Sequence, residues 1–195
     1  MKQQWTVMAL LCAAMVAVYL VDLPLGGALT AFGVHPRDIG SAYTIFTSPF
    51  IHADFAHLAN NLLAFAVLGM LCMLHGIRYF TKASLLIIVV GGALLWLFGR
   101  GGSHIGASGW IFGLWSLAIA QAWFDRSPRN FAVALGVAIF YGGMIFGILP
   151  MQSGISFEGH LFGALAGVVA ASVLARKAEV EIMPPVREGE LKFWS

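Results

Sequence analysis

Long apolar stretches alternate with short polar or glycine- and proline-rich segments along the chain as far as residue 175. Six of them predict helices that cross a bilayer: Trp5–Leu23, His57–Leu74, Ala83–Phe98, Ile105–Phe124, Phe131–Leu149 and Gly159–Ala175. Spanning the hydrocarbon takes about 20 mostly apolar helical residues, and backbone polar groups in lipid need partners within the chain. Strand-like alternation is absent. The pattern predicts an all-α membrane protein with a bundle of six transmembrane helices.

The positions of the basic residues predict the orientation of this bundle. With a cytoplasmic N-terminus, all but two of the 11 Lys and Arg residues lie on the cytoplasmic side, and the two exceptions are Arg37 and Arg100. Such an excess is typical of cytoplasmic loops. We therefore expect an integral multi-pass protein of the cell (plasma) membrane with both termini in the cytoplasm.

The chain is expected to divide into a transmembrane domain, residues 1–175, and a short, poorly ordered cytoplasmic tail, residues 176–195. The first apolar stretch also resembles a signal peptide. However, it is long and no Ala-x-Ala cleavage site follows it, which favours a retained transmembrane helix. The longest connection, Pro24–Ile51, mixes Gly, Pro, Phe and Tyr, so we expect it to lie at the outer membrane interface.

Composition narrows the possible partners. Hydrophobic residues make up 59% of the chain and charged residues only 10%, against roughly 25% charged residues in soluble domains. The lipid bilayer is therefore the main partner. A net charge of +2 with no basic patch argues against nucleic acid. Cys12 and Cys72 both lie in apolar stretches, so we interpret them as core thiols rather than a disulfide or metal pair.

Four polar residues lie where the pattern predicts membrane-embedded helices. His57 and Asn61 lie at the outer end of the second predicted helix, Ser108 near the outer end of the fourth, and His160 at the outer end of the sixth. These three helices all run from outside to inside, so the four residues share one depth. Because polar groups within spans are costly and usually face the bundle interior or a water-filled cavity, this placement predicts a site.

Helical spacing sharpens the prediction. His57 and Asn61 are four residues apart and share a face. Phe112 lies one turn below Ser108, where an aromatic ring can pack against an imidazole. Glycines at four-residue intervals in the fourth and sixth stretches let two helices approach closely, and these are Gly109, Gly113, Gly159, Gly163 and Gly167.

Serine and histidine at one depth suggest nucleophilic catalysis. A serine hydroxyl is a weak nucleophile unless a nearby base takes its proton, and histidine titrates near neutral pH. Acyl transfer also needs donors that stabilise the developing oxyanion. Glu158 is two residues from His160, which on a helix directs it elsewhere, and no other Asp or Glu is placed to orient His160. We therefore predict a Ser–His dyad rather than a triad.

Three motifs resemble the rhomboid family of intramembrane serine proteases, in the family's order and over residues 5–175. They are Gly106-Ala107-Ser108-Gly109, His57-Leu58-Ala59-Asn60-Asn61 and Gly159-His160-Leu161-Phe162-Gly163. The resemblance implies a rhomboid-like six-helix bundle in which Ser108 is the nucleophile and His160 the general base. It also implies an oxyanion hole formed by His57, Asn61 and the backbone N–H of Ser108.

The resemblance assigns supporting roles as well. Phe112 matches the aromatic residue that packs on the catalytic histidine, and His52 matches a histidine expected to support the outer-loop junction. Gly106, Gly109 and Gly163 belong to the motifs. The implied substrates are transmembrane proteins cut near the outer surface, with neither metal nor cofactor. The chain departs from the family where Tyr43-Thr44 replaces a common Trp-Arg pair, and where Met73, Leu74 and His75 replace a glutamate.

Other interpretations of these residues remain open. Ser108 alone would be a helix-packing residue, Asn60 is interpreted as structural, and His104, four residues before Ser108, is a rival base. His52 and His57 could suggest a metal, but no carboxylate or cysteine partner accompanies them. Two other functions compete: an inactive rhomboid-like protein that binds membrane clients, and a small transporter or channel. The sequence indicates neither the oligomeric state nor the particular substrate.

Overall fold

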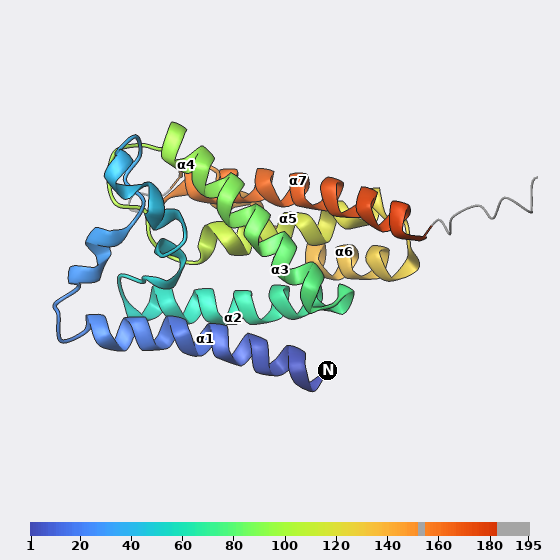
Figure 1. Ribbon diagram of the computed structural model, residues 1–195, viewed down its shortest axis with the longest axis horizontal. Helices are drawn as coiled ribbons and strands as arrows, with labels where there is room; N and C mark the ends of the chain where they lie inside the picture. The colour runs from blue at the N-terminus through green and yellow to red at the C-terminus, as the bar shows by residue number, and fades with distance from the viewer. Residues whose placement is uncertain (152–154, 183–195) are drawn as a thin grey trace, which may run out of the picture.

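The computed structural model describes residues 1–151 and 155–182 as a bundle of helices (Figure 1). The α-helices are α1 (Lys2–Asp22), α2 (Phe55–Cys72), α3 (Ile77–Leu86), α4 (Gly92–Phe98), α5 (Ser108–Phe124), α6 (Pro128–Tyr141) and α7 (Phe157–Ile182). The part of the chain that the structure describes contains no strand, only an isolated bridge between Val34 and His104. The all-helical prediction is therefore confirmed for these residues.

Five helical stretches are long and apolar enough to cross a membrane, which makes the chain an integral multi-pass membrane protein. They are Lys2–Asp22, Phe55–His75, Ile77–Phe98, Pro128–Ile148 and Phe157–Ala175. The remaining predicted span, α5, has 17 residues and is shorter than these five. The predicted count of six spans is therefore not confirmed, because one of the six falls short on length.

Several helix boundaries differ from the predicted ones because of local capping. α2 begins at Phe55, since the Asp54 side chain accepts a hydrogen bond from the backbone N–H of His57. α6 begins at Pro128, since Ser127 caps it and proline is favoured in the first turn. The third span extends from Ile77 through a π-helical segment, Ile87–Gly91. α7 continues to Ile182, into the predicted tail, and the rest of that tail lies outside the described residues.

α5 runs through the centre of the bundle and packs most extensively against α7 (Figure 1). All its residues from Trp110 to Ala118 are buried. The two backbones touch at the glycines, since a Cβ atom on Gly163 would overlap the carbonyl of Gly109, and one on Gly167 that of Gly113. The Ser116 hydroxyl donates a hydrogen bond to the carbonyl of Ala164 at 2.6 Å. The predicted glycine contact therefore fixes the spacing of α5 and α7.

This packing predicts opposite effects for two Gly→Ala substitutions. Gly163→Ala should lower the free energy of unfolding by about 1–3 kcal/mol, because the new methyl group cannot be accommodated without moving the α5 backbone. Gly136→Ala is the matched control, since a Cβ atom there meets nothing within 4 Å. It should raise stability by up to about 1 kcal/mol through helix propensity. Thermal unfolding in detergent measures both, and a destabilisation of equal size in the two variants would contradict the packing argument.

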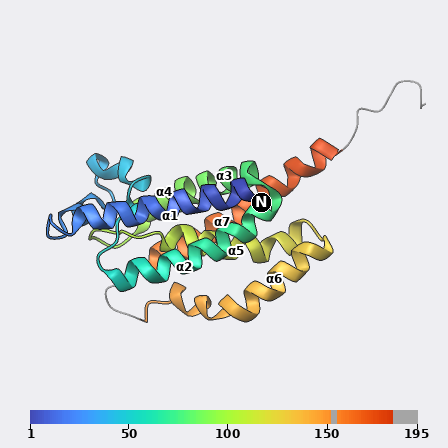
Figure 2. The same ribbon diagram turned by 90° about the horizontal axis from the view of Figure 1, so that it is seen from below.

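The segment between α1 and α2 gathers at one end of the bundle, where α4 ends and α7 begins (Figures 1 and 2). It contains the short 3-10 helices Ala28–Phe32, Ile39–Ile45 and Ser48–Phe50. Thr44 is buried, and its hydroxyl bonds to the carbonyls of Gly33 (2.9 Å) and Ser41 (2.6 Å). Tyr43 is exposed. At the place of the family's Trp-Arg pair, the loop is therefore held by a threonine that bonds to backbone carbonyls.

Candidate active site

The side chains of Ser108 and His160 meet between the first turns of α5 and α7. His160 Nε2 lies 2.9 Å from Ser108 Oγ, and His160 Nδ1 lies 2.9 Å from the carbonyl oxygen of Gly147. A carbonyl only accepts, so Nδ1 carries the proton and Nε2 offers a lone pair to the serine hydroxyl. The neutral imidazole is thus held in the tautomer that can receive the proton of Ser108.

Phe112 fixes the plane of the His160 ring. The two rings are stacked, with centroids 4.1 Å apart and an interplanar angle of 7°. His160 itself is buried, and Ser108 is half-buried. Three contacts therefore constrain the imidazole: the hydroxyl of Ser108, the carbonyl of Gly147 and the face of Phe112.

The chain enters α5 through a turn that brings two further polar side chains next to Ser108. Gly106 has φ of 102°, a left-handed value that favours glycine. A Cβ atom on Gly106 would lie 2.6 Å from His57 Cε1 and 3.7 Å from Asn61 Nδ2. The imidazole of His57 and the amide of Asn61 therefore both face the backbone two residues before Ser108, a position that admits no side chain.

Backbone donors are also available at this point. The first N–H groups of a helix have no intrahelical partner, and the dipole of the helix favours negative charge there. α5 begins at Ser108, so the N–H of Ser108 belongs to this group. Asn61 is buried, and its Nδ2 donates to the carbonyl of His57 at 2.9 Å, which leaves the second amide hydrogen for another acceptor.

His52 lies behind this turn and supports it. Its ring is 1% exposed, with Nδ1 3.3 Å from the carbonyl of Phe50 and Nε2 accepting from the N–H of Ala107 at 3.5 Å. The ring also packs edge-on against His57, with centroids 5.0 Å apart. His52 thus connects the end of the segment between α1 and α2 to the residue before Ser108.

Burial, followed by the neighbouring His57, lowers the pKa of His52 from 6.5 to about 4. Between these values the unfolded chain binds a proton that the folded chain does not, so stability should fall as the pH falls from 6.5 towards 4. After allowance for solvent screening, the loss should be about 2 kcal/mol. Unfolding measured across this range in the wild type and in His52→Gln tests the prediction. An equally steep loss in His52→Gln would contradict it, and His35→Gln, at a more exposed histidine, is the control.

His104, the rival base, is engaged elsewhere. Its Nδ1 lies 2.6 Å from Ser156 Oγ and its Nε2 lies 2.9 Å from the carbonyl of Arg100. Both ring nitrogens are therefore occupied away from Ser108. Glu158, two residues before His160, pairs with Arg100.

The partner of His160 Nδ1 was not predicted from the sequence. The carbonyl of Gly147 belongs to the backbone of the 3-10 helix Gly142–Ile148 that follows α6. A backbone acceptor has no side chain and hence no residue type that could have indicated it. Ser156 was not predicted either, because its place before α7 is marked only by the general preference for serine at helix starts.

A small cavity of about 60 Å³ lies beside the candidate nucleophile. Its walls include Ser108, Trp110, Ile87, Leu95 and Gly159, and a volume of this size admits water. Among residues 1–151 and 155–182, no three His, Cys, Asp or Glu side chains are grouped so that they could hold a metal ion. Ser108 offers a hydroxyl, His160 an imidazole, and His57, Asn61 and the start of α5 offer hydrogen-bond donors.

Comparison with known proteins places the chain in a family. The model of the Rhomboid domain matches residues 40–177. An uncharacterized protein of Mycobacterium tuberculosis is 35% identical over 193 residues, covering 93% of this chain and 80% of that protein. An uncharacterized protein of Mycobacterium leprae is 34% identical over 172 residues, covering 84% and 68%. Rhomboid-like protein 11, chloroplastic, of Arabidopsis thaliana is 28% identical over 149 residues, covering 69% and 53%. The chain belongs to the rhomboid family.

Proposed function

We propose that the chain is an intramembrane serine endopeptidase that cleaves transmembrane segments of membrane proteins near the outer surface. The observation that carries the proposal is the 2.9 Å contact between His160 Nε2 and Ser108 Oγ. The bond from His160 Nδ1 to the Gly147 carbonyl supports it, because that bond sets the tautomer that a general base requires. Membership of the rhomboid family supports the same class of reaction.

The reaction follows from these positions. Ser108 Oγ attacks the scissile carbonyl carbon while its proton passes to His160 Nε2. The carbonyl oxygen becomes an oxyanion, stabilised by donors from His57, Asn61 and the N–H of Ser108. His160 then gives its proton to the leaving amine, and the C–N bond breaks to leave an acyl-enzyme. Water, activated by His160, hydrolyses the ester and restores Ser108. The cavity beside Ser108 is a place from which that water can come.

The membrane setting completes the proposal. α5 is the fourth of six spans along the chain, and it is short because its first residue is the nucleophile and the residues before it form the turn at Gly106. Both termini are cytoplasmic, residues 1–175 form the protease domain, and residues 176–195 form a short tail. The active site then opens towards the outer side of the plasma membrane. The partners are the lipid bilayer and transmembrane protein substrates.

Reconstituted protein offers a direct test of this function. Proteoliposomes that contain the wild type and a panel of single-span transmembrane proteins should yield fragments cut near the outer end of the span, and Ser108→Ala should yield none. Ser108→Ala should still bind the substrates that the wild type cuts. If the wild type binds clients but cuts none, the inactive rhomboid-like alternative is correct. Transport of a solute with no cleavage would favour the transporter.

A further inference from the structure

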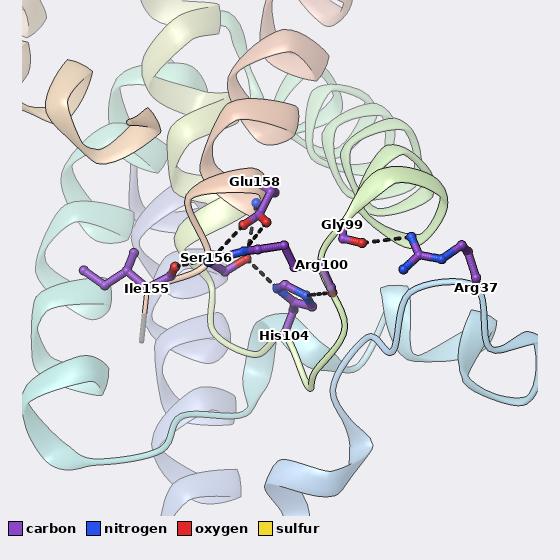
Figure 3. A network of polar contacts seen from close by, with 8 residues as sticks. Arg37, Gly99, Arg100, His104, Ile155, Ser156 and Glu158 are labelled. Carbon is purple, nitrogen blue, oxygen red and sulfur yellow. Dashed lines mark hydrogen bonds and ion pairs between the residues drawn. The ribbon is translucent and has the colours of Figure 1, made fainter. Parts of the chain in front are cut away.

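A network of polar contacts joins the segments that lead into the two catalytic helices (Figure 3). One segment, residues 99–107, precedes Ser108, and the other, residues 155–157, precedes His160. We infer that Arg100, His104, Ser156 and Glu158 form a clasp that holds the first turn of α7, and with it His160, in register with Ser108. These four are positioning residues, since none of them touches Ser108 or the ring of His160 in the contacts that the structure gives them.

The first half of the clasp is an ion pair. The guanidinium of Arg100 binds both carboxylate oxygens of Glu158, with its Nη2 3.1 Å from Oε2, and also donates to the carbonyl of Ile155 at 3.1 Å. The Glu158 side chain is only 7% exposed, while that of Arg100 is 59% exposed. Most exposed ion pairs contribute little, but a buried carboxylate without its partner is strongly unfavourable. Loss of Arg100 would therefore leave the Glu158 carboxylate, in the first turn of α7, without its ion-pair partner.

The second half is a chain of hydrogen bonds with a single direction. In the neutral tautomer in which His104 Nε2 donates to the carbonyl of Arg100 at 2.9 Å, His104 Nδ1 accepts from the Ser156 hydroxyl at 2.6 Å. Ser156 Oγ in turn accepts from the N–H of Gly159 at 3.2 Å, and the Ser156 carbonyl accepts from the N–H of His160 at 3.3 Å. Ser156 thus caps α7, and His104 fixes the orientation of the capping hydroxyl.

The register of His160 needs this support because of where it lies. The glycine contacts between α5 and α7 reach the first turn of α7 at Gly159, whose carbonyl oxygen would lie 3.1 Å from a Cβ atom on Gly109. His160 lies in the same turn, and the ends of helices fray. The clasp adds side-chain and capping contacts that tie this turn to the segment that carries the Gly106 turn. A displacement of about 1 Å at such a position costs up to about 10²-fold in rate.

The test compares two outer arginines that bind the same connecting segment. Arg37 donates to the carbonyls of Leu97 (3.2 Å) and Gly99 (2.9 Å) and, among the residues that the structure describes, makes no hydrogen bond to α7, so Arg37→Ala is the matched control for Arg100→Ala. Labelling of Ser108 by a fluorophosphonate, measured over a range of probe concentrations, separates reactivity from probe binding. Hydrogen–deuterium exchange of the amides of residues 157–160 reports the first turn of α7 without any need for activity.

Arg100→Ala and Ser156→Ala should each lower the maximal labelling rate about 10- to 100-fold, with the half-saturating probe concentration unchanged. Both should also speed exchange in the first turn of α7. Arg37→Ala should do neither. Ser156→Thr should restore most of the rate, since threonine keeps the capping hydroxyl. Arg100→Lys should restore only part, since lysine lacks the planar fork that binds both carboxylate oxygens.

The labelling test of the clasp rests on the proposed function, but the exchange test does not. The clasp and the proposed function can therefore fail separately. If the wild type labels but Arg100→Ala and Ser156→Ala label as fast as Arg37→Ala, the positioning role is wrong and the proposed function stands. If the wild type never labels, the proposed function fails, and exchange alone decides. Exchange in Arg100→Ala that is no faster than in Arg37→Ala would then overturn the clasp as well.

Discussion

Replacing His160 by alanine is expected to lower the rate of peptide-bond cleavage by about 10⁴- to 10⁶-fold, the range observed when a serine nucleophile or one of its partners is removed. The reason is that the hydroxyl of Ser108 has one base within reach, His160 Nε2 at 2.9 Å. The alternative base, His104, has both ring nitrogens bonded elsewhere. The rate of product formation from a cleaved transmembrane substrate, followed by quantitative mass spectrometry, measures the loss.

His35→Ala provides the control for this substitution. His35 lies in the segment between α1 and α2, where its Nε2 is 3.1 Å from the carbonyl of Ala31 in an exposed contact. The His35→Ala variant should cleave at the wild-type rate. Thermal unfolding of both variants checks that the fold is retained. A folded His160→Ala variant that cleaves as fast as His35→Ala would show that His160 is not the base.

Replacing Asn61 by alanine is expected to lower kcat by about 10²- to 10³-fold with little change in KM, as when one donor to an oxyanion is lost. The amide of Asn61 is buried and faces the backbone at Gly106, two residues before Ser108. A donor in this position acts on the charge that develops during attack, so its loss affects the chemical step rather than substrate binding.

Asn60 is the matched control, since it is the same residue type one position earlier on α2 and its side chain is exposed. Asn60→Ala should leave kcat unchanged. Asn61→Ala also removes the bond from Nδ2 to the carbonyl of His57, so the free energy of unfolding is measured in both variants. A fall in activity of equal size in the two variants, or one accounted for by unfolding, would contradict the oxyanion role.

The sequence predicts most of the arrangement because side-chain chemistry repeats at helical spacing. Glycines four residues apart indicate the contact between α5 and α7, and the contact of Gly163 with Gly109 agrees. Phe112, one turn below Ser108, was expected to pack on an imidazole, and it stacks on His160. The motifs led to the rhomboid family, which the family model confirms. The catalytic roles of these residues remain predictions.

Features that depend on the backbone were not predictable in this way. The carbonyl of Gly147, which orients His160, has no side chain to reveal it. α6 begins at Pro128 rather than at the predicted Phe131 because Ser127 caps the helix. Hydropathy carries no information on such local capping. The predicted count of six spans is not confirmed, also because of the backbone. α5 is only 17 residues long because the turn at Gly106 replaces its first helical residues.

Departures from the family pattern also became interpretable only with the structure. The inner end of α2 lacks the family's glutamate, and His75 occupies this region. Its Nε2 lies 2.9 Å from Oδ1 of Asn130. The Nδ2 of Asn130 donates to the carboxylate of Asp125 at 2.8 Å. Residues 55 positions apart form this contact between α6 and the 3-10 helix Met73–His75 that follows α2, so no local pattern in the sequence could indicate it.

The central claim is that His160 activates Ser108, and labelling with a fluorophosphonate tests it most directly because no substrate need be known. Purified wild type, Ser108→Ala and His160→Ala are treated with the probe in detergent, and the modified residue is identified by mass spectrometry. We predict one adduct, on Ser108, in the wild type and none in either variant. A folded wild type that never labels, or a His160→Ala variant that labels Ser108 at the wild-type rate, would contradict the claim.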